Sequence, residues 1–148
     1  MSGALLVLGR ITDKLARGES MEKKKILVID DEPSMHRLLQ IILEDEGFRV
    51  VEPGESEETS QSIARGKPDV IILDIMMPEV NGFDVLRMLK DDEDTRNIPV
   101  IILSVRSFEE DRKKAKSLGA DIYMTKPFQP AELIRTIKDI LASRNDDR

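Results

Sequence analysis

The chain has 148 residues, the usual size of one domain and long enough to bury a sizeable core. Apolar residues make up 40% and charged residues 35%, as in soluble globular proteins, and because aromatic residues make up only 3% the core must be largely aliphatic. The absence of cysteine excludes disulfides and thiolate metal sites, and the net charge of −6 argues against non-specific binding of nucleic acid.

The first segment, residues 1–22, differs from the rest of the chain. Its longest apolar run, residues 4–8, is too short to span a membrane, and no basic region precedes it as in a signal peptide. We therefore expect a cytoplasmic protein with no membrane span. Leucine and isoleucine recur here at helical spacing. Three origins stay open for this segment: a native amphipathic extension, the tail of an upstream domain, or sequence added by cloning.

From residue 25 onward, short apolar runs alternate with helical patterns. The predicted strands are residues 26–29, 48–51, 70–73, 99–103 and 121–125. The predicted helices are residues 33–47, 56–66, 82–90, 109–118 and 130–142. This alternation predicts a doubly wound α/β domain with a parallel sheet. We place the domain at residues 23–143, between the extension at 1–22 and a short polar tail at 144–148.

Polar side chains follow four of the predicted strands. Asp30 and Asp31 follow the first strand, Asp74 follows the third, Ser104 follows the fourth and Lys126 follows the fifth. Parallel strands point the same way, so these residues should gather at one edge of the sheet. Clustered carboxylates repel one another unless a cation neutralises them. A cluster that offers only oxygen ligands suits a hard ion such as Mg²⁺.

This set of side chains predicts the acceptance of a phosphoryl group. An aspartate beside Mg²⁺ and a lysine can act as a nucleophile and form an aspartyl-phosphate. The metal ion and the Lys126 ammonium would offset charge on the phosphoryl oxygens in the transition state. Ser104 offers a hydroxyl donor to a phosphoryl oxygen.

The chain resembles the receiver domain of two-component response regulators over residues 25–143. Four motifs carry the resemblance, in order and at matching spacing: Ile-Leu-Val-Ile-Asp-Asp-Glu at 26–32, the segment 69–82 around Asp74, Ser104 after the fourth strand, and Gly-Ala-Asp-Ile-Tyr-Met-Thr-Lys-Pro-Phe at 119–128. The resemblance implies a flavodoxin-like sheet of strand order 2-1-3-4-5, as in the chemotaxis regulator, with helices on both faces.

The resemblance also implies roles for single residues. Asp74 would be the phosphoacceptor. Asp30, Asp31 and Asp74 would bind Mg²⁺ together with the backbone carbonyl of Met76. Lys126 would form an ion pair with the phosphoryl group.

Two further features follow from the same resemblance. The peptide bond before Pro127 would be cis, which only a small minority of such bonds are. Ser104 and Tyr123 would form a switch pair, in which the hydroxyl moves toward the phosphoryl group and the aromatic ring turns inward.

The resemblance further implies partners. The phosphoryl donor would be a sensor histidine kinase or a phosphotransfer protein, and no direct contact with nucleic acid is expected. A downstream partner would dock on the surface of the helix at 109–118, the strand at 121–125 and the helix at 130–142. Phosphorylation-dependent dimerisation is a further expectation. His36, the sole histidine, is expected to be exposed and without a phosphotransfer role. The sequence does not indicate which downstream response the domain controls. It also leaves two alternatives for the chain, a stand-alone regulator or a fragment of a longer protein.

Three positions bear on the chemistry. Val105 stands where the family usually has a small residue, and its bulk is expected to narrow access to Asp74. This leaves a phosphorylation-independent interaction module as the alternative function. Met76 and Arg106 occupy positions that modulate dephosphorylation in the family. A hydrolase of the aspartyl-phosphate type is rejected, because Met76 stands where such an enzyme would need an acid/base carboxylate.

Overall fold

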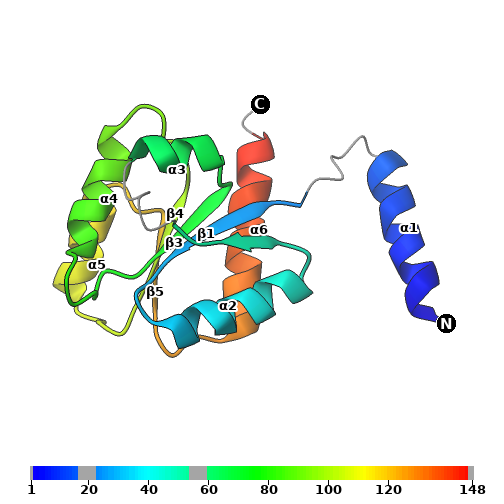
Figure 1. Ribbon diagram of the computed structural model, residues 1–148, viewed down its shortest axis with the longest axis horizontal. Coiled ribbons are helices and arrows are strands. Elements are labelled where there is room, and N and C mark those ends of the chain that lie inside the picture. The colour runs from blue at the N-terminus through cyan, green and yellow to red at the C-terminus, as the bar shows by residue number, and fades with distance from the viewer. Residues whose placement is uncertain (1, 17–22, 54–59, 147–148) are drawn as a thin grey trace.

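The computed structural model describes residues 2–16, 23–53 and 60–146 (Figure 1). The strands in these ranges are β1 (Lys25–Ile29), β2 (Arg49–Val51), β3 (Val70–Leu73), β4 (Val100–Ser104) and β5 (Ile122–Thr125). The helices are α1 (Ser2–Ala16), α2 (Pro33–Asp45), α3 (Ser60–Gly66), α4 (Gly82–Asp91), α5 (Glu109–Ser117) and α6 (Pro130–Asp146). None of these helices has the length and apolar character that crossing a membrane requires.

The five strands form one parallel sheet in the order β2-β1-β3-β4-β5. The predicted fold class and strand order are therefore confirmed. The strand order reverses between β1 and β3, which pair directly although β2 lies between them in the sequence. In open α/β sheets such a switch point opens a crevice at the carboxyl ends of the strands.

Helices cover both faces of the sheet (Figure 1). On one face, Leu43 of α2 and Leu133 of α6 belong to a core with alternate sheet residues. On the other face, Ile63 of α3, Leu86 of α4 and Ala115 of α5 belong to a second core. A sheet covered in this way needs strands that are apolar on both faces, which explains the continuous apolar runs in the sequence.

Strand β3 shows this arrangement most clearly. Val70 and Ile72 point into the first core, and Ile71 and Leu73 point into the second. All four side chains are buried. Because β3 pairs with β1 on one side and β4 on the other, its carboxyl end is held at the centre of the sheet edge.

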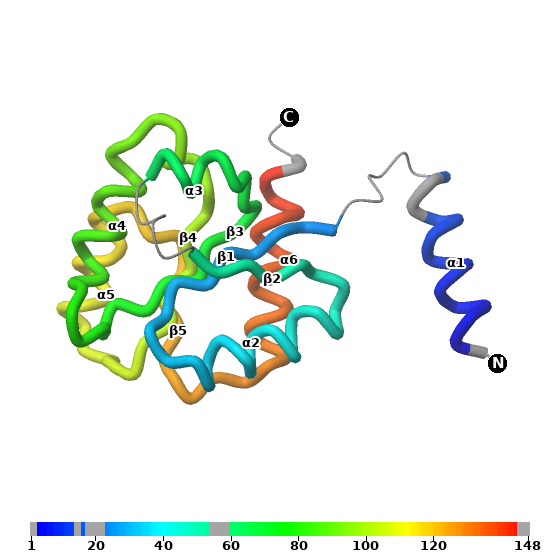
Figure 2. The backbone as a smooth tube through the Cα atoms, in the orientation of Figure 1, coloured from blue at the N-terminus to red at the C-terminus, as the bar shows by residue number. Residues whose placement is uncertain are grey.

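Helix α1 lies to one side of the domain (Figures 1 and 2). The predicted helical pattern in this segment is confirmed, although the predicted end at residues 18–20 lies outside the described residues. Leu5, Leu6, Val7 and Leu8 are all more than half exposed. An isolated helix of this length is marginal in water. None of the α1 side chains that the structure describes belongs to either of the two cores above.

Several predicted details were wrong. Helix α6 continues to Asp146, beyond the predicted end at residue 142, because the polar residues there include no glycine or proline to stop it. Leu38 belongs to the apolar pattern of α2 but is 44% exposed, because the buried stripe follows Leu39 and Leu43. Strand β2 begins at Arg49 rather than at residue 48. The first residues of the helix predicted at 56–66 lie outside the described residues, which resume at Ser60 with α3.

Gly82, at the start of α4, allows the chain to pass very close to the end of β3. A Cβ atom at this position would lie 2.8 Å from the Asp74 carbonyl oxygen and would collide with Ile75 Cα. We expect Gly82→Ala to lower the free energy of unfolding by about 1–3 kcal/mol, because backbone atoms rather than a flexible side chain must move. Denaturant unfolding followed by circular dichroism measures this.

The matched control is Gly66→Ala, where a Cβ atom would meet nothing within 4 Å. Because alanine is the better helix former, this variant should gain up to about 1 kcal/mol. Equal unfolding midpoints for the two variants would contradict the close approach at Gly82.

Candidate functional site

The register of the sheet brings the predicted site residues together. Ile29 of β1 pairs with Leu73 of β3, so Asp30 and Asp74 leave neighbouring strands at the same level. The Asp74 N–H also donates to the Ile29 carbonyl at 2.9 Å. On the other side of the site, the Lys126 N–H donates to the Ser104 carbonyl at 2.7 Å.

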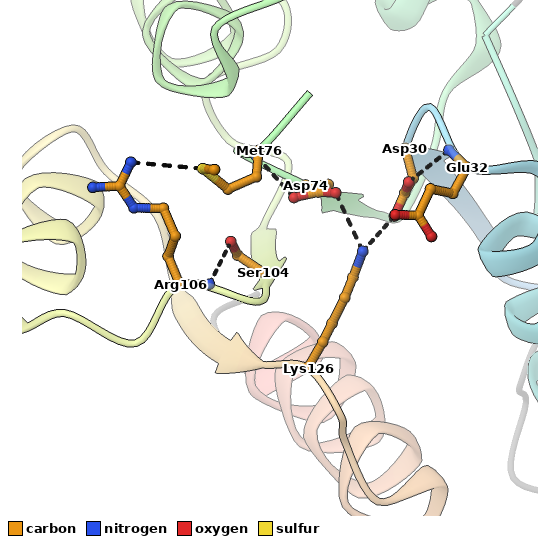
Figure 3. Close-up of polar contacts among 7 residues, drawn as sticks. All are labelled: Asp30, Glu32, Asp74, Met76, Ser104, Arg106 and Lys126. Carbon is orange, nitrogen blue, oxygen red and sulfur yellow. Dashed lines mark hydrogen bonds and ion pairs between the residues drawn. The ribbon is translucent and has the colours of Figure 1, made fainter. Parts of the chain in front are cut away.

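Lys126 bridges the two buried carboxylates (Figure 3). Its Nζ atom lies 2.8 Å from Asp30 Oδ2 and 3.2 Å from Asp74 Oδ2. The Lys126 side chain is 8% exposed, so these charges face little solvent. The peptide bond from Lys126 to Pro127 is cis.

The carboxylates also set the ionisation of Lys126. Burial of the ammonium disfavours its charge, but the hydrogen bond to Asp30 and the charges of Asp74 and Asp30 outweigh burial, so the pKa of Lys126 is raised above its ordinary value of 10.5. The ammonium is therefore present at neutral pH. Stability from these ion pairs is complete below the ordinary pKa and is lost only as the pH rises through the raised pKa.

Backbone N–H groups hold the remaining carboxylate oxygens in place. Asp74 Oδ1 accepts from the Met76 N–H at 2.8 Å, and Asp30 Oδ1 accepts from the Glu32 N–H at 2.9 Å (Figure 3). Asp74 is only 4% exposed. These hydrogen bonds fix the orientation of both carboxylates, which leaves Asp74 Oδ2 and Asp30 Oδ2 for Lys126.

Asp30, Asp31 and Asp74 can each offer one oxygen such that all three lie within 4.8 Å of one another. Asp31 is exposed, whereas the side chains of Asp30 and Asp74 are buried, so the cluster runs from solvent to the interior. The cluster contains three carboxylates and one ammonium, that of Lys126, so negative charge is in excess. Oxygen ligands with excess negative charge fit Mg²⁺, and the predicted metal-binding aspartates are thus brought together.

Ser104 lies on β4 and Tyr123 lies on β5, and the side chains of both form hydrogen bonds with the backbone of Arg106. Ser104 is fully buried, and its Oγ accepts from the Arg106 N–H at 3.2 Å. The Tyr123 hydroxyl donates to the Arg106 carbonyl at 2.9 Å. The predicted switch residues therefore share one neighbour, which the sequence analysis did not link to either of them.

Burial raises the pKa of the half-buried Tyr123 above its ordinary value of 10.0, although a hydrogen bond with Ser104 opposes the shift. Tyr123 is the only tyrosine, so absorbance at alkaline pH reports it alone. We expect its titration midpoint to lie above 10 in the folded protein and near about 10 in urea. The stability linked to Tyr123 should accordingly fall as the pH rises through the raised pKa. Equal titration midpoints in the folded protein and in urea would contradict the partial burial of the Tyr123 hydroxyl.

Other positions correct or extend the sequence analysis. The His36 side chain is only 17% exposed, because it packs with its Nδ1 3.6 Å from Glu52 Oε2, so its expected exposure was wrong. Val105 is 64% exposed. Asp111 is buried although most residues of α5 are charged, and its Oδ2 accepts from Arg106 Nε at 2.9 Å. In the sequence, only the spacing of four residues between Asp111 and Ala115, the apolar residue that α5 buries, places Asp111 on the inward face.

Comparisons with known proteins agree with this geometry. The family model of the response regulator receiver domain matches residues 26–138. The chain is 38% identical over 118 residues to the phosphate regulon transcriptional regulatory protein PhoB of Escherichia coli, a match that covers 80% of this chain and 52% of PhoB. The chain thus spans about half the length of the curated relatives it matches.

Solved receiver domains have the same fold. The receiver domain of a signal transduction histidine kinase from Syntrophus aciditrophicus aligns with a TM-score of 0.68 at 32% identity, covering 81% of this chain and 91% of that one. The receiver domain of the sensor histidine kinase PA1611 from Pseudomonas aeruginosa aligns with a TM-score of 0.72 at 26% identity, covering 82% and 99%. That structure has a magnesium ion coordinated in its active site cleft.

Proposed function

This chain belongs to the family of response regulator receiver domains, which are signalling domains of two-component systems rather than classical enzymes, and we propose that it is a switch phosphorylated on Asp74. The observation that carries this proposal is the Lys126 ammonium held between the buried carboxylates of Asp30 and Asp74. One positive charge is already fixed beside the acceptor oxygen.

The proposed reaction is a phosphoryl transfer to the Asp74 carboxylate. A carboxylate oxygen forms a bond to phosphorus as the bond from phosphorus to the donor nitrogen or oxygen breaks, and the donor leaves with that electron pair. Lys126 neutralises charge on the phosphoryl oxygens, and the Met76 N–H orients the acceptor. Mg²⁺, held by Asp30, Asp31, Asp74 and the Met76 carbonyl, would supply further charge compensation.

Phosphorylation is proposed to bias the Ser104 and Tyr123 pair. The Ser104 hydroxyl would leave the Arg106 N–H for a phosphoryl oxygen, and the environment of the Tyr123 hydroxyl would change with it. Tyr123 lies against α5, where the Arg112 guanidinium is 4.9 Å from the centre of its ring, so the surface of α5, β5 and α6 would present a different shape to a partner. Phosphorylation-dependent dimerisation through this surface remains a prediction.

The proposed donor is a sensor histidine kinase or a phosphotransfer protein in the cytoplasm. The family and the receiver domains that match it support this, because such domains take part in two-component signalling. The proposal does not extend to the downstream response that the switch controls. The match covers 52% of PhoB, so that regulator has a further part to which this chain offers no counterpart in the alignment. Loss of the phosphoryl group from Asp74 by hydrolysis completes the proposed cycle.

Intact-protein mass after incubation with acetyl phosphate tests the proposal. We expect a single phosphoryl adduct that forms with Mg²⁺, fails to form with EDTA, and is lost in hydroxylamine as an acyl phosphate is. Peptide mapping should place it on Asp74. A folded protein that forms no adduct with acetyl phosphate or with candidate kinases would instead support the phosphorylation-independent interaction module. In that case Val105→Ala is the first variant to test, because access to Asp74 is then in question.

A further inference from the structure

Asp111 is a buried carboxylate that the proposed phosphoryl chemistry does not use. It lies in the first turn of α5 and is 6% exposed, whereas Glu109 and Glu110 in the same turn are exposed. A buried carboxylate is costly unless it is paired and hydrogen-bonded. Asp111 Oδ2 accepts from Arg106 Nε at 2.9 Å, which supplies both the charge and the hydrogen bond.

Arg106 connects this carboxylate to the two proposed switch residues. Its N–H donates to Ser104 Oγ and its carbonyl accepts from the Tyr123 hydroxyl. The backbone of Arg106 therefore contacts Ser104 and Tyr123, while its side chain is bonded to α5. Any displacement of the Arg106 backbone must act against the ion pair with Asp111.

The Arg106 side chain also reaches the loop that follows β3. Its Nη1 lies 3.6 Å from Met76 Sδ, and the Met76 N–H is bonded to Asp74 Oδ1 (Figure 3). The guanidinium lies 5.7 Å from the centre of the Phe108 ring. A planar guanidinium is suited to several directed contacts at once, so fixing it at Asp111 also fixes its position against Met76.

We propose that Asp111 is a positioning residue that acts through Arg106. By holding the Arg106 side chain, Asp111 keeps the Arg106 carbonyl on the Tyr123 hydroxyl and links the phosphoacceptor side of the sheet to α5. The part of this inference that concerns signalling rests on the proposed function. The part that concerns Tyr123 applies to the unphosphorylated protein and is tested separately.

Quenching of tyrosine fluorescence by acrylamide tests the positioning, because the chain has one tyrosine and no tryptophan. We expect Asp111→Asn to raise the quenching constant of Tyr123 about twofold, as the loop opens locally. Glu110→Gln is the matched control: it removes the same charge from the same helical turn without touching Arg106, and should behave as wild type. Asp111→Glu, which restores the carboxylate, should recover much of the protection.

A double-mutant cycle separates positioning from a general structural role. Arg106→Ala keeps the backbone carbonyl and should raise the quenching constant as Asp111→Asn does. Adding Asp111→Asn to Arg106→Ala should then have no further effect. If Asp111→Asn does not fold, the quenching constant of Arg106→Ala decides whether the Arg106 side chain protects Tyr123. A quenching constant unchanged from the Glu110→Gln value, or an added effect in the Arg106→Ala background, would overturn the inference.

The signalling part is tested by repeating the measurement with acetyl phosphate and Mg²⁺. Wild type should show a change in quenching on phosphorylation that Asp111→Asn loses, although Asp111→Asn still gains the phosphoryl mass. A variant that keeps the full change overturns the coupling. A wild type that gains no mass refutes the proposed function instead, while the cycle in unphosphorylated protein still decides the role of Asp111.

Discussion

Replacing Asp74 with asparagine is expected to abolish the incorporation of a phosphoryl group and to leave the domain folded. The amide is no longer a nucleophile, so labelling by acetyl phosphate with Mg²⁺ should fall at least about a hundredfold. Folding should survive because the amide oxygen can still accept the Met76 N–H that now bonds Asp74 Oδ1. Intact mass and circular dichroism of the same sample measure the two effects.

Asp84→Asn is the control for this change, because it removes an equal charge from an exposed position on α4. The Asp84 carboxylate forms only a surface pair with Arg87 at 3.4 Å, and its side chain is 67% exposed. This variant should be labelled as wild type is. Persistent labelling of Asp74→Asn would instead place the acceptor on another residue and refute the site assignment.

Replacing Lys126 with methionine should be the most destabilising substitution at the site. The change leaves the carboxylates of Asp30 and Asp74 buried without the ammonium that bridges them. Removing one partner of a buried ion pair typically costs about 3–5 kcal/mol, so we expect a loss of that order in the free energy of unfolding in EDTA. Urea unfolding measures it.

Lys138→Met provides the contrast. Lys138 Nζ lies 3.0 Å from Glu46 Oε2, a distance close to that of the buried pair, but its side chain is 56% exposed. An exposed pair of this kind contributes about 0–1 kcal/mol. Mg²⁺ should restore part of the stability of Lys126→Met and none of that of Lys138→Met, because a cation among the carboxylates replaces the missing charge. Equal losses for the two variants in EDTA would show that burial does not strengthen the pair.

Much of the fold was predictable because the strands carry unambiguous patterns. The four residues of β3 and the first four residues of β4 are all apolar, so neither strand has a polar face and both had to be covered by helices. Once the strands are parallel, the positions of Asp30 and Asp74 at their ends place the two carboxylates side by side. The acidic cluster was therefore predictable from register and strand direction alone.

The connections of Arg106 were not predictable in the same way. Asp111 belongs to a helix whose residues are mostly charged, and charge usually marks a solvated face, but α5 turns this one carboxylate inward. His36 and Leu38 show the same limit, since each sits at the border of the buried stripe of α2, where a small rotation of the helix decides exposure. Helical periodicity locates a face but not the angle at which it docks.

The two-sided burial of β3 has a consequence for how the domain moves. A strand paired on both edges and packed on both faces exchanges its amide hydrogens only when the whole domain opens. The Asp74 N–H, bonded to the Ile29 carbonyl at the end of that strand, should belong to this slowest class in hydrogen-exchange measurements. Local breathing would then be confined to the loops that face the acidic cluster. A destabilising mutation in either core would therefore reduce the fraction of molecules that are folded without loosening the acceptor in those that remain.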